Sequence, residues 1–439
     1  MNQFNMQLPS AVTLALERLE SFGHEAYVVG GAVRDAMLGR PLHDYDITTS
    51  ASPDEIKEVF SDFHTILTGE KHGTVTVIVD GMPLEITTYR IDGDYTDGRR
   101  PDSVEFTKNI REDLARRDFT VNAMAYSPRR GLCDPFGGAD DLKIGVIRAV
   151  GNPIRRFTED SLRILRAFRF AARLGFEIEE KTLSAAKSER WRLSAVSAER
   201  IGSEILGLLS AERPSKSLCM MHSAHILGEI MPRAYFESLA LKSFSAIDFV
   251  PEGYPDGLYL KKERAREASL GFISARAHLA ALRLGMLLRD SEKDIALGVP
   301  KLLKMSTELS AIVAAASGGL LPKRGDPATV RTYASGLTGK TTPKFAYFTL
   351  LSAGARGERL ASGDKASDAA RNLYESAERG EPLSVSELAL SGRDLMDRGV
   401  PAGARVGEVL NELLAAVLAN PEFNTRENLL SLIDDMNRG

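Results

Sequence analysis

The order of secondary-structure signals constrains the fold of this chain more than any other feature. Up to about residue 150, short alternating apolar segments mix with helical patterns, whereas strand signals nearly vanish beyond it. At 439 residues the chain is too long for one ordinary core. We therefore expect an α+β fold, in which an N-terminal region with a small mixed β-sheet is followed by helices alone.

Composition places the chain among water-soluble globular proteins, with 43% hydrophobic and 26% charged residues. The net charge of −4 disfavours indiscriminate nucleic-acid binding, yet Arg99 to Arg173 contains sixteen Lys or Arg against ten Asp or Glu. Cys133 and Cys219 are too few for a disulfide framework. Because no secretory signal or membrane-length apolar run is found, we expect a cytoplasmic protein without a membrane partner.

Two acids, Asp44 and Asp46, lie one residue apart in a segment that follows His43 and otherwise has the pattern of a strand. Side chains alternate along a strand, so both carboxylates should point to the same face. Neighbouring carboxylates repel each other, and a divalent cation between them relieves the repulsion. Glu85, on the returning strand of a predicted hairpin, is a candidate third carboxylate; the alternative is a solvated strand edge.

A paired-glycine turn precedes these acids. The apolar segment Ala26 to Val29 runs directly into Gly30 and Gly31, and a helical pattern follows. Glycines allow a tight turn whose N–H groups approach a ligand, and Arg34 adds a charged fork suited to phosphate oxygens. The sequence thus predicts an anion site, with a plain turn and a surface arginine as the alternative.

A helix is predicted from Thr158 to Leu174, with Thr158 as its N-cap and Gly175 as its stop. Four charged residues recur at every third position and form a polar stripe: Asp160, Arg163, Arg166 and Arg169. Such a stripe is either a solvated helix face or a recognition surface. A second helical pattern covers residues 111–126.

Four motifs occur in one order within about 130 residues. They are Gly30-Gly31-x-x-Arg34-Asp35, Asp44-x-Asp46, Arg116-Arg117-Asp118-Phe119-Thr120-x-Asn122-Ala123 and Arg156-Phe157-x-Glu159-Asp160-x-x-Arg163. Together they resemble the class II tRNA nucleotidyltransferases, the bacterial CCA-adding and poly(A) polymerase family within the polymerase beta superfamily. The resemblance covers residues 25 to about 210, and weaker likeness recurs near the C-terminus, at residues 390–395 and 424–430.

The resemblance implies roles for individual residues. Asp44 and Asp46 would hold two Mg²⁺ ions, with Glu85 as the third catalytic carboxylate. Gly31 and Arg34 would contact the triphosphate. The Asp160 and Arg163 pair would read the edge of the base, and Arg166 and Arg169, beyond the last motif, would support the nucleotide nearby. The other nucleotide-binding residues fall in the third motif: Arg117, Asp118 and Asn122.

The resemblance also implies a domain order and partners. A polymerase-beta-like catalytic head would span residues 1–150, a base-recognising neck 151–210, a helical body 211–345 and a tRNA-binding helical tail 346–439. The partners would be CTP, ATP and the acceptor and T arm of tRNA, with no obligate protein partner.

Three sibling activities remain open: CCA addition, CC or A addition alone, and polyadenylation. Thr68 to Val75 resembles the CCA-adding form, and the polar loop from Ile91 to Pro101 has full length, which favours complete CCA addition. A noncatalytic RNA-binding protein is expected to lose the acids that this chain keeps. A small-molecule nucleotidyltransferase would not need the helical remainder.

Overall fold

The computed structural model describes residues 4–42, 44–67, 69, 73–93, 103–238, 242–249, 272–337 and 342–436. The chain forms two compact units. The first consists of Met1–Glu204 and Met220–Ile230, and the second of Ile205–Cys219 and Met231–Gly439. The first unit thus contains the whole predicted head and most of the predicted neck. The domain boundaries at residues 150, 210 and 345 remain predictions.

The named strands all belong to the first unit. Its elements are α1 (Ser10–Ser21), β1 (Ala26–Val29), α2 (Gly31–Met37), β2 (Asp46–Thr49), α3 (Pro53–Val59), β3 (His64–Ile66), β4 (Thr74–Val79), β5 (Met82–Thr88), β6 (Arg90–Asp92), β7 (Val104–Phe106), α4 (Ile110–Ala115), the 3₁₀ turn η2 (Thr120–Asn122), β8 (Ala125–Ser127), β9 (Gly131–Cys133), α5 (Gly138–Ile144), β10 (Val146–Ile147), α6 (Pro153–Glu159), α7 (Leu162–Leu174), β11 (Glu177–Ile178), α8 (Glu180–Glu189), η3 (Arg190–Ala195) and α11 (Leu227–Ile230).

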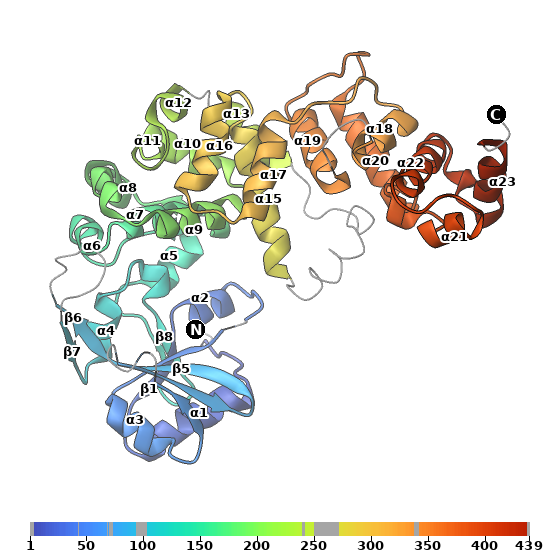
Figure 1. Cartoon of the computed structure of the whole chain (residues 1–439). Helices are drawn as coiled ribbons and strands as arrows, with labels where there is room; N and C mark the ends of the chain where they lie inside the picture. The colour runs from blue at the N-terminus through green and yellow to red at the C-terminus, as the bar shows by residue number, and fades with distance from the viewer. Residues whose placement is uncertain are drawn as a thin grey trace. The chain divides into compact units, whose positions relative to one another are not determined.

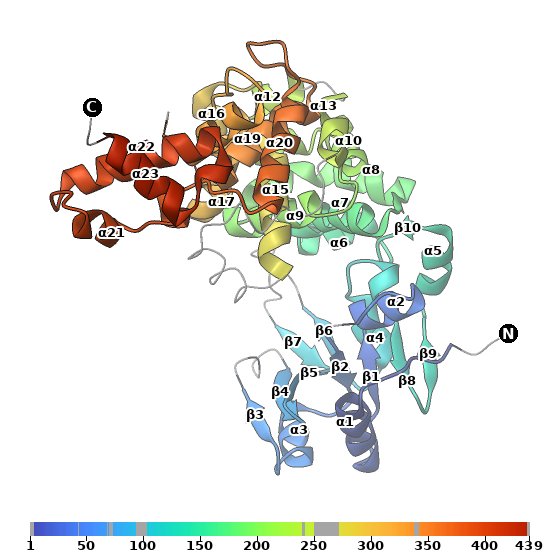
Figure 2. The same cartoon turned by 90° about the vertical axis from the view of Figure 1, so that its right-hand side faces the viewer.

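A seven-stranded mixed sheet organises this unit, in the order β3-β4-β5-β2-β1-β8-β9. Strands β2 and β5 are parallel, and the other neighbouring pairs are antiparallel. Helices α1 and α3 contact each other and the sheet, and Figure 1 shows both beside its blue strands. Figure 2 gives the same sheet from the side. The predicted α+β class is confirmed.

Local signals explain several of these elements. Ser52 and Glu55 form a complete capping box at the start of α3, with Pro53 in its first turn. The β4–β5 hairpin closes through Asp80 and Gly81, both at positive φ, as a tight hairpin turn requires. The hairpin predicted from the sequence is therefore confirmed.

The helix predicted from Thr158 to Leu174 is confirmed from Leu162 to its stop at Gly175, but its predicted start at Thr158 is wrong. Helix α6 ends at Glu159 and α7 begins at Leu162, with Asp160 extended between them at φ −143° and ψ 102°. The Asp160 carboxylate accepts the Leu162 N–H at 3.1 Å. This side-chain bond replaces the backbone bond that a continuous helix would make, and it starts α7 afresh.

The helix predicted over residues 111–126 is also wrong beyond its first turns. Helix α4 ends at Ala115, η2 follows, and Ala125 already pairs with Val29 in the sheet. The Asp118 carboxylate accepts the Phe119 N–H at 2.8 Å, again in competition with helical bonding. The predicted loop after Arg90 begins instead as β6, and its residues 94–101 lie outside the described part.

The second unit is helical. Helices α9 (Ala198–Leu209) and α10 (Ser215–Ser223) cross between the units along the chain. The others are α12 (Arg233–Ser238), α13 (Lys242–Ser245), η4 (Ala246–Phe249), α15 (Phe272–Leu287), α16 (Lys293–Leu302), α17 (Thr307–Gly318), α18 (Pro327–Ser335), α19 (Pro343–Ala355), α20 (Ala366–Glu378), η6 (Val385–Glu387), α21 (Gly392–Asp397), α22 (Ala404–Ala419), η7 (Pro421–Phe423) and α23 (Arg426–Met436). Within the described residues, no helix has both the length and the apolar character to cross a bilayer.

A glycine contact fixes α5 against the segment that contains η2. A Cβ added at Gly138 would lie 2.2 Å from the Thr120 carbonyl oxygen. We expect Gly138→Ala to lower the free energy of unfolding by roughly 2 kcal/mol or more, because rigid backbone must move. Gly298→Ala, in α16 with no heavy atom within 4 Å of the added Cβ, is the control and should be neutral or slightly stabilising. Equal urea midpoints for both variants would contradict this close packing.

Candidate active site

Asp46 and Glu85 lie opposite each other in the parallel β2–β5 pair. Both side chains are exposed, whereas the following residues, Ile47 and Ile86, are buried. Register partners in a parallel pair point to the same face, so the two carboxylates are neighbours on one face of the sheet. Asp44 precedes the strand, which begins at Asp46. The alternation of side chains along a strand therefore does not determine to which face Asp44 points.

Electrostatics connect Asp44 to this pair. Loss of solvent raises the pKa of the Asp46 carboxyl, the charge of Asp44 raises it further, and Arg117 opposes both. Among the described residues, no three Asp, Glu, His or Cys side chains are close enough together to hold a metal ion. Still, exposed carboxylates that repel each other supply the oxygen ligands that a hard divalent cation prefers. The residues present therefore fit such an ion.

Arg117 brings the third motif to the acidic face. Its guanidinium interacts with the charge of Asp46, while burial lowers its pKa. The Arg117 Nε is buried and has no hydrogen-bond partner in the described structure. A Cβ added at Gly30, whose φ is +72°, would lie 3.1 Å from Arg117 Nη1. The glycine turn thus leaves space for the Arg117 guanidinium beside Asp46, and the Nε donor of this guanidinium is unused.

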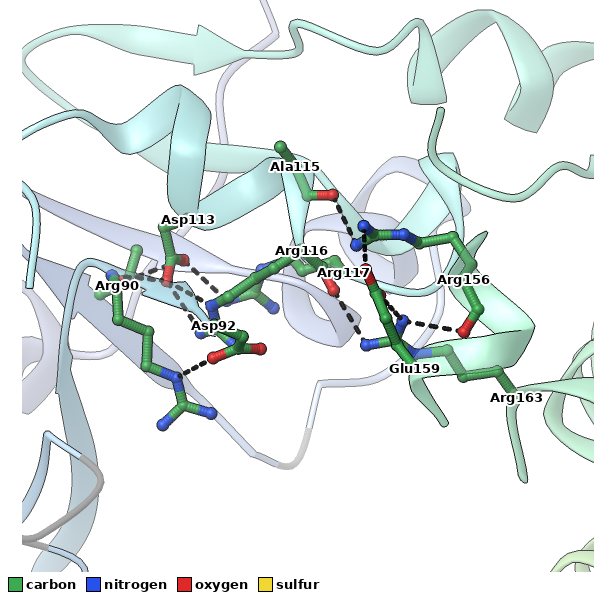
Figure 3. A network of polar contacts seen from close by, with 10 residues as sticks. Arg90, Asp92, Asp113, Ala115, Arg116, Arg117, Arg156, Glu159 and Arg163 are labelled. Carbon is green, nitrogen blue, oxygen red and sulfur yellow. Dashed lines mark hydrogen bonds and ion pairs between the residues drawn. The ribbon is translucent and has the colours of Figure 1, made fainter. Parts of the chain in front are cut away.

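Asp113, which the sequence reasoning missed, organises the arginines next to this face (Figure 3). Its carboxylate is fully buried and accepts bonds from Arg116 Nη2 at 2.8 Å, from Arg117 Nη2 at 3.4 Å and from the Arg90 N–H at 3.4 Å. Burial raises the pKa of Asp113, but the two arginines outweigh it and hold the pKa below its ordinary value. The signal was present, since an acid three and four residues before two arginines predicts pairing on a helix.

A chain of polar contacts joins the glycine turn to α7. Arg34 is buried and donates to both oxygens of Asp35, at 2.8 and 2.9 Å, and to Asn122 Oδ1 at 2.6 Å. Asn122 Nδ2 donates to Asp118 Oδ1 at 3.1 Å, and Arg166 reaches Asp118 Oδ2 at 2.7 Å. Burial raises the pKa of Asp118, but Arg166 and Asn122 hold it below its ordinary value. Four predicted site residues are therefore in one network, and the Arg34 fork is engaged by Asp35.

The remaining predicted residues have separate partners. Asp160 Oδ2 accepts from Arg200 Nη2 at 2.7 Å, and no hydrogen bond joins the Asp160 and Arg163 side chains. Arg163 instead donates to Glu159 Oε2 at 2.7 Å and to the Arg116 carbonyl at 3.1 Å, as Figure 3 shows. Arg169 pairs with Glu204 at 2.5 Å. The predicted base-reading pair is thus close in sequence but bound to different partners.

Comparisons with known proteins match most of the first unit and the beginning of the second. Residues 26–148 match the poly A polymerase head domain, and residues 175–236 match the probable RNA and SrmB-binding site of polymerase A. The CCA-adding enzyme of Lactobacillus gasseri is 35% identical over 424 residues, which cover 94% of each chain. That of Ligilactobacillus salivarius is 47% identical over 217 residues; the match spans about half of that relative, or 52%.

Solved structures agree along nearly the whole chain. The Bacillus stearothermophilus CCA-adding enzyme in complex with CTP has a TM-score of 0.68 and 26% identity, covering 98% of each chain. The Thermotoga maritima CCA-adding enzyme complexed with tRNA, at 21% identity, shares the fold, with a TM-score of 0.65 over 99% of this chain. A mixed sheet with adjacent acids and a matching head define a nucleotidyltransferase of the polymerase beta superfamily. Within that class, the chain belongs to the CCA-adding enzyme family, and the resemblance seen in the sequence is confirmed. Membership implies use of a divalent metal ion.

The buried ion pairs of Asp113 generate a pH-dependent prediction. We expect Asp113→Asn to lower the free energy of unfolding near pH 7 by roughly 3 kcal/mol, because it leaves Arg116 and Arg117 without their carboxylate. A lowered carboxyl pKa contributes stability above the unfolded-state pKa of about 4 and loses it as the pH falls below that value. The difference from wild type should therefore shrink between about pH 5 and pH 2 in urea unfolding.

Glu112→Gln is the matched control for this experiment, because it removes the same charge one position earlier on α4, where the side chain is only partly buried. It should cost less than about 1 kcal/mol. A difference between Asp113→Asn and wild type that stays constant with pH would show that the Asp113 charge does not stabilise the fold.

Proposed function

We propose that the protein is a template-independent tRNA nucleotidyltransferase that completes the 3′ end of tRNA with CCA, using CTP and ATP. One observation carries the proposal: Asp46 and Glu85 are register partners on one face of the sheet, with Asp44 and Arg117 beside them. Relatives named CCA-adding enzymes, including structures with CTP, with ATP and with tRNA, support the substrates. The cytoplasm is the proposed location, and the two free thiols fit its reducing conditions.

The chain's own residues supply charge and position for phosphoryl transfer. Asp44 and Asp46 would hold Mg²⁺, with Glu85 as the neighbouring carboxylate. When bound, the ion lowers the pKa of the tRNA 3′-hydroxyl and offsets charge on the triphosphate. Arg117 places a guanidinium near Asp46, and its positive charge suits a phosphate oxygen. The glycine turn leaves room for this guanidinium, so the phosphates and the carboxylates meet at one place.

Base choice without a template falls to the neck residues. Asp160 is an acceptor and Arg163 a donor, which together match the edges of C or A and leave G or U with mismatched groups. Arg163 is engaged by Glu159 and by the Arg116 carbonyl, and Asp160 by Arg200. Reading a base therefore requires these side chains to exchange or share their present partners. Arg166 and Arg169 would support the nucleotide beside them.

The proposal predicts the products of a direct assay. Transcripts of tRNA that lack CCA, or that end in C or CC, should each be extended to CCA with CTP, ATP and Mg²⁺, as seen on sequencing gels. Addition of AMP to the CC-ended transcript alone would indicate an A-adding enzyme, and stopping after CC a CC-adding one. A long adenosine tail on arbitrary RNA would indicate a poly(A) polymerase. Binding of tRNA without any incorporation would leave a noncatalytic RNA-binding protein.

The catalytic control for this assay is Asp44→Ala. Loss of a metal-holding carboxylate should lower incorporation of both CMP and AMP by about a thousandfold, since several kcal/mol of transition-state stabilisation disappear. Asp62→Ala, at an exposed aspartate in the turn after α3 that pairs with Arg18 on α1, is the matched control and should stay active. Near-normal turnover by Asp44→Ala would remove the metal assignment.

Nucleotide choice gives a separate prediction for Asp160. Asp160→Asn keeps an oxygen for the α7 N-terminus but adds a donor, so discrimination of CTP and ATP against UTP and GTP should fall about tenfold or more. Asp160→Ala should relax choice as well and should also lower stability by about 1 kcal/mol, since the cap is lost. The measurement is kcat/KM for each of the four nucleotides. Unchanged ratios in both variants would exclude Asp160 from base recognition.

A further inference from the structure

Phe170 lies among three arginines of the candidate site. The guanidinium carbons of Arg169, Arg166 and Arg34 are 4.5, 5.3 and 5.4 Å from the centre of its ring. Only 5% of Phe170 is exposed. A guanidinium within about 6 Å of an aromatic ring is attracted by the electrons of the ring face, and the attraction is greatest where water is excluded. One buried ring therefore interacts with three positive charges.

These arginines come from two separate segments of the first unit. Arg34 lies on α2, directly after the glycine turn, whereas Arg166 and Arg169 lie on α7. Arg34 pairs with Asp35 and Arg166 with Asp118, while Glu204 pairs with Arg169 at 2.5 Å and lies 3.9 Å from Arg166. Among the ion pairs of the described residues, no single acid contacts all three guanidiniums. The Phe170 ring lies beside each of them.

A second aromatic contact fixes the ring itself. Phe119, in the same motif as Arg117 and Asp118, meets Phe170 edge-on, with ring centres 5.8 Å apart and planes at 76°. Phe119 is fully buried, so the ring of Phe170 has a rigid support. Phe119 of the third motif therefore supports the Phe170 ring, which also contacts Arg34 on α2 and two arginines on α7.

We propose that Phe170 is a positioning residue for three arginines. It holds Arg34, which would contact the triphosphate, at a fixed distance from Arg166 and Arg169, which would support the nucleotide near its base. The inference rests on the proposed function, because it takes these arginines as nucleotide contacts. An aliphatic side chain fills similar space but has no ring electrons to attract three like charges, which then repel one another. Without the ring, the arginines keep their polar partners but lose a contact that all three share.

The test compares Phe170→Leu with Phe168→Leu in the full-length protein. Phe168 lies on the same helix and is fully buried, but no arginine lies over its ring among the cation–π contacts of the structure. Binding of CTP and of ATP is measured by calorimetry without tRNA, and KM and kcat are measured on a CC-ended transcript. We expect Phe170→Leu to raise both Kd and KM about tenfold with kcat changed less than about threefold. Phe168→Leu should leave Kd within about threefold at a similar loss of thermal stability, and Phe170→Tyr, which keeps the ring, should bind like wild type.

Two outcomes would overturn the role of Phe170. Equal losses of nucleotide affinity in Phe170→Leu and Phe168→Leu would mean that the ring only fills the core, and unchanged affinity in Phe170→Leu would mean that the arginines do not depend on it. Failure of the proposed function is a distinct result. Wild-type protein that binds CTP more tightly than Phe170→Leu but extends no transcript would refute CCA addition and uphold the positioning role.

Discussion

The parallel pairing of β2 with β5 is the contact on which the candidate site depends. It places Asp46 against Glu85, and a slip of one residue would send every side chain of one strand to the other face. On its other side, β5 pairs with β4 along six partnered positions that begin at the tight turn of Asp80 and Gly81. The hairpin that carries Glu85 is therefore ordered along both of its strands.

Around this face, positive charges are held by acids rather than left for a ligand. Arg34 is engaged by Asp35, Arg116 by the buried Asp113, and Arg166 by Asp118. Charges removed from water are costly unless paired, so these acids keep the arginines in place before a substrate arrives. A triphosphate entering here would compete with these carboxylates for guanidinium donors, because the Arg117 Nε, which has no partner in the described structure, is itself buried.

The sequence predicts those parts of the fold that local chemistry decides. The β4–β5 hairpin and the helix stop at Gly175 follow from a few neighbouring residues and are confirmed. The break at Asp160 escaped prediction because the same carboxylate suits either a helical first turn or a cap, and Arg200, forty residues later, favours the second. The full role of Asp113 could not be predicted, because its contacts with Arg90 and Thr48 join segments that only the folded chain brings near.

Four of the predicted residues form one connected set, which joins Arg34 on α2 to Arg166 on α7. Arg34 reaches Asn122, Asn122 reaches Asp118, and Asp118 holds Arg166. Phe170 closes this chain into a ring of contacts, since it lies beside both terminal arginines. Any movement of Arg166 toward a base weakens the hold on Asp118 and, through Asn122, alters the surroundings of Arg34. The residues proposed for base choice and those proposed for phosphate placement are thus physically linked in this unit, because each set fixes members of the other.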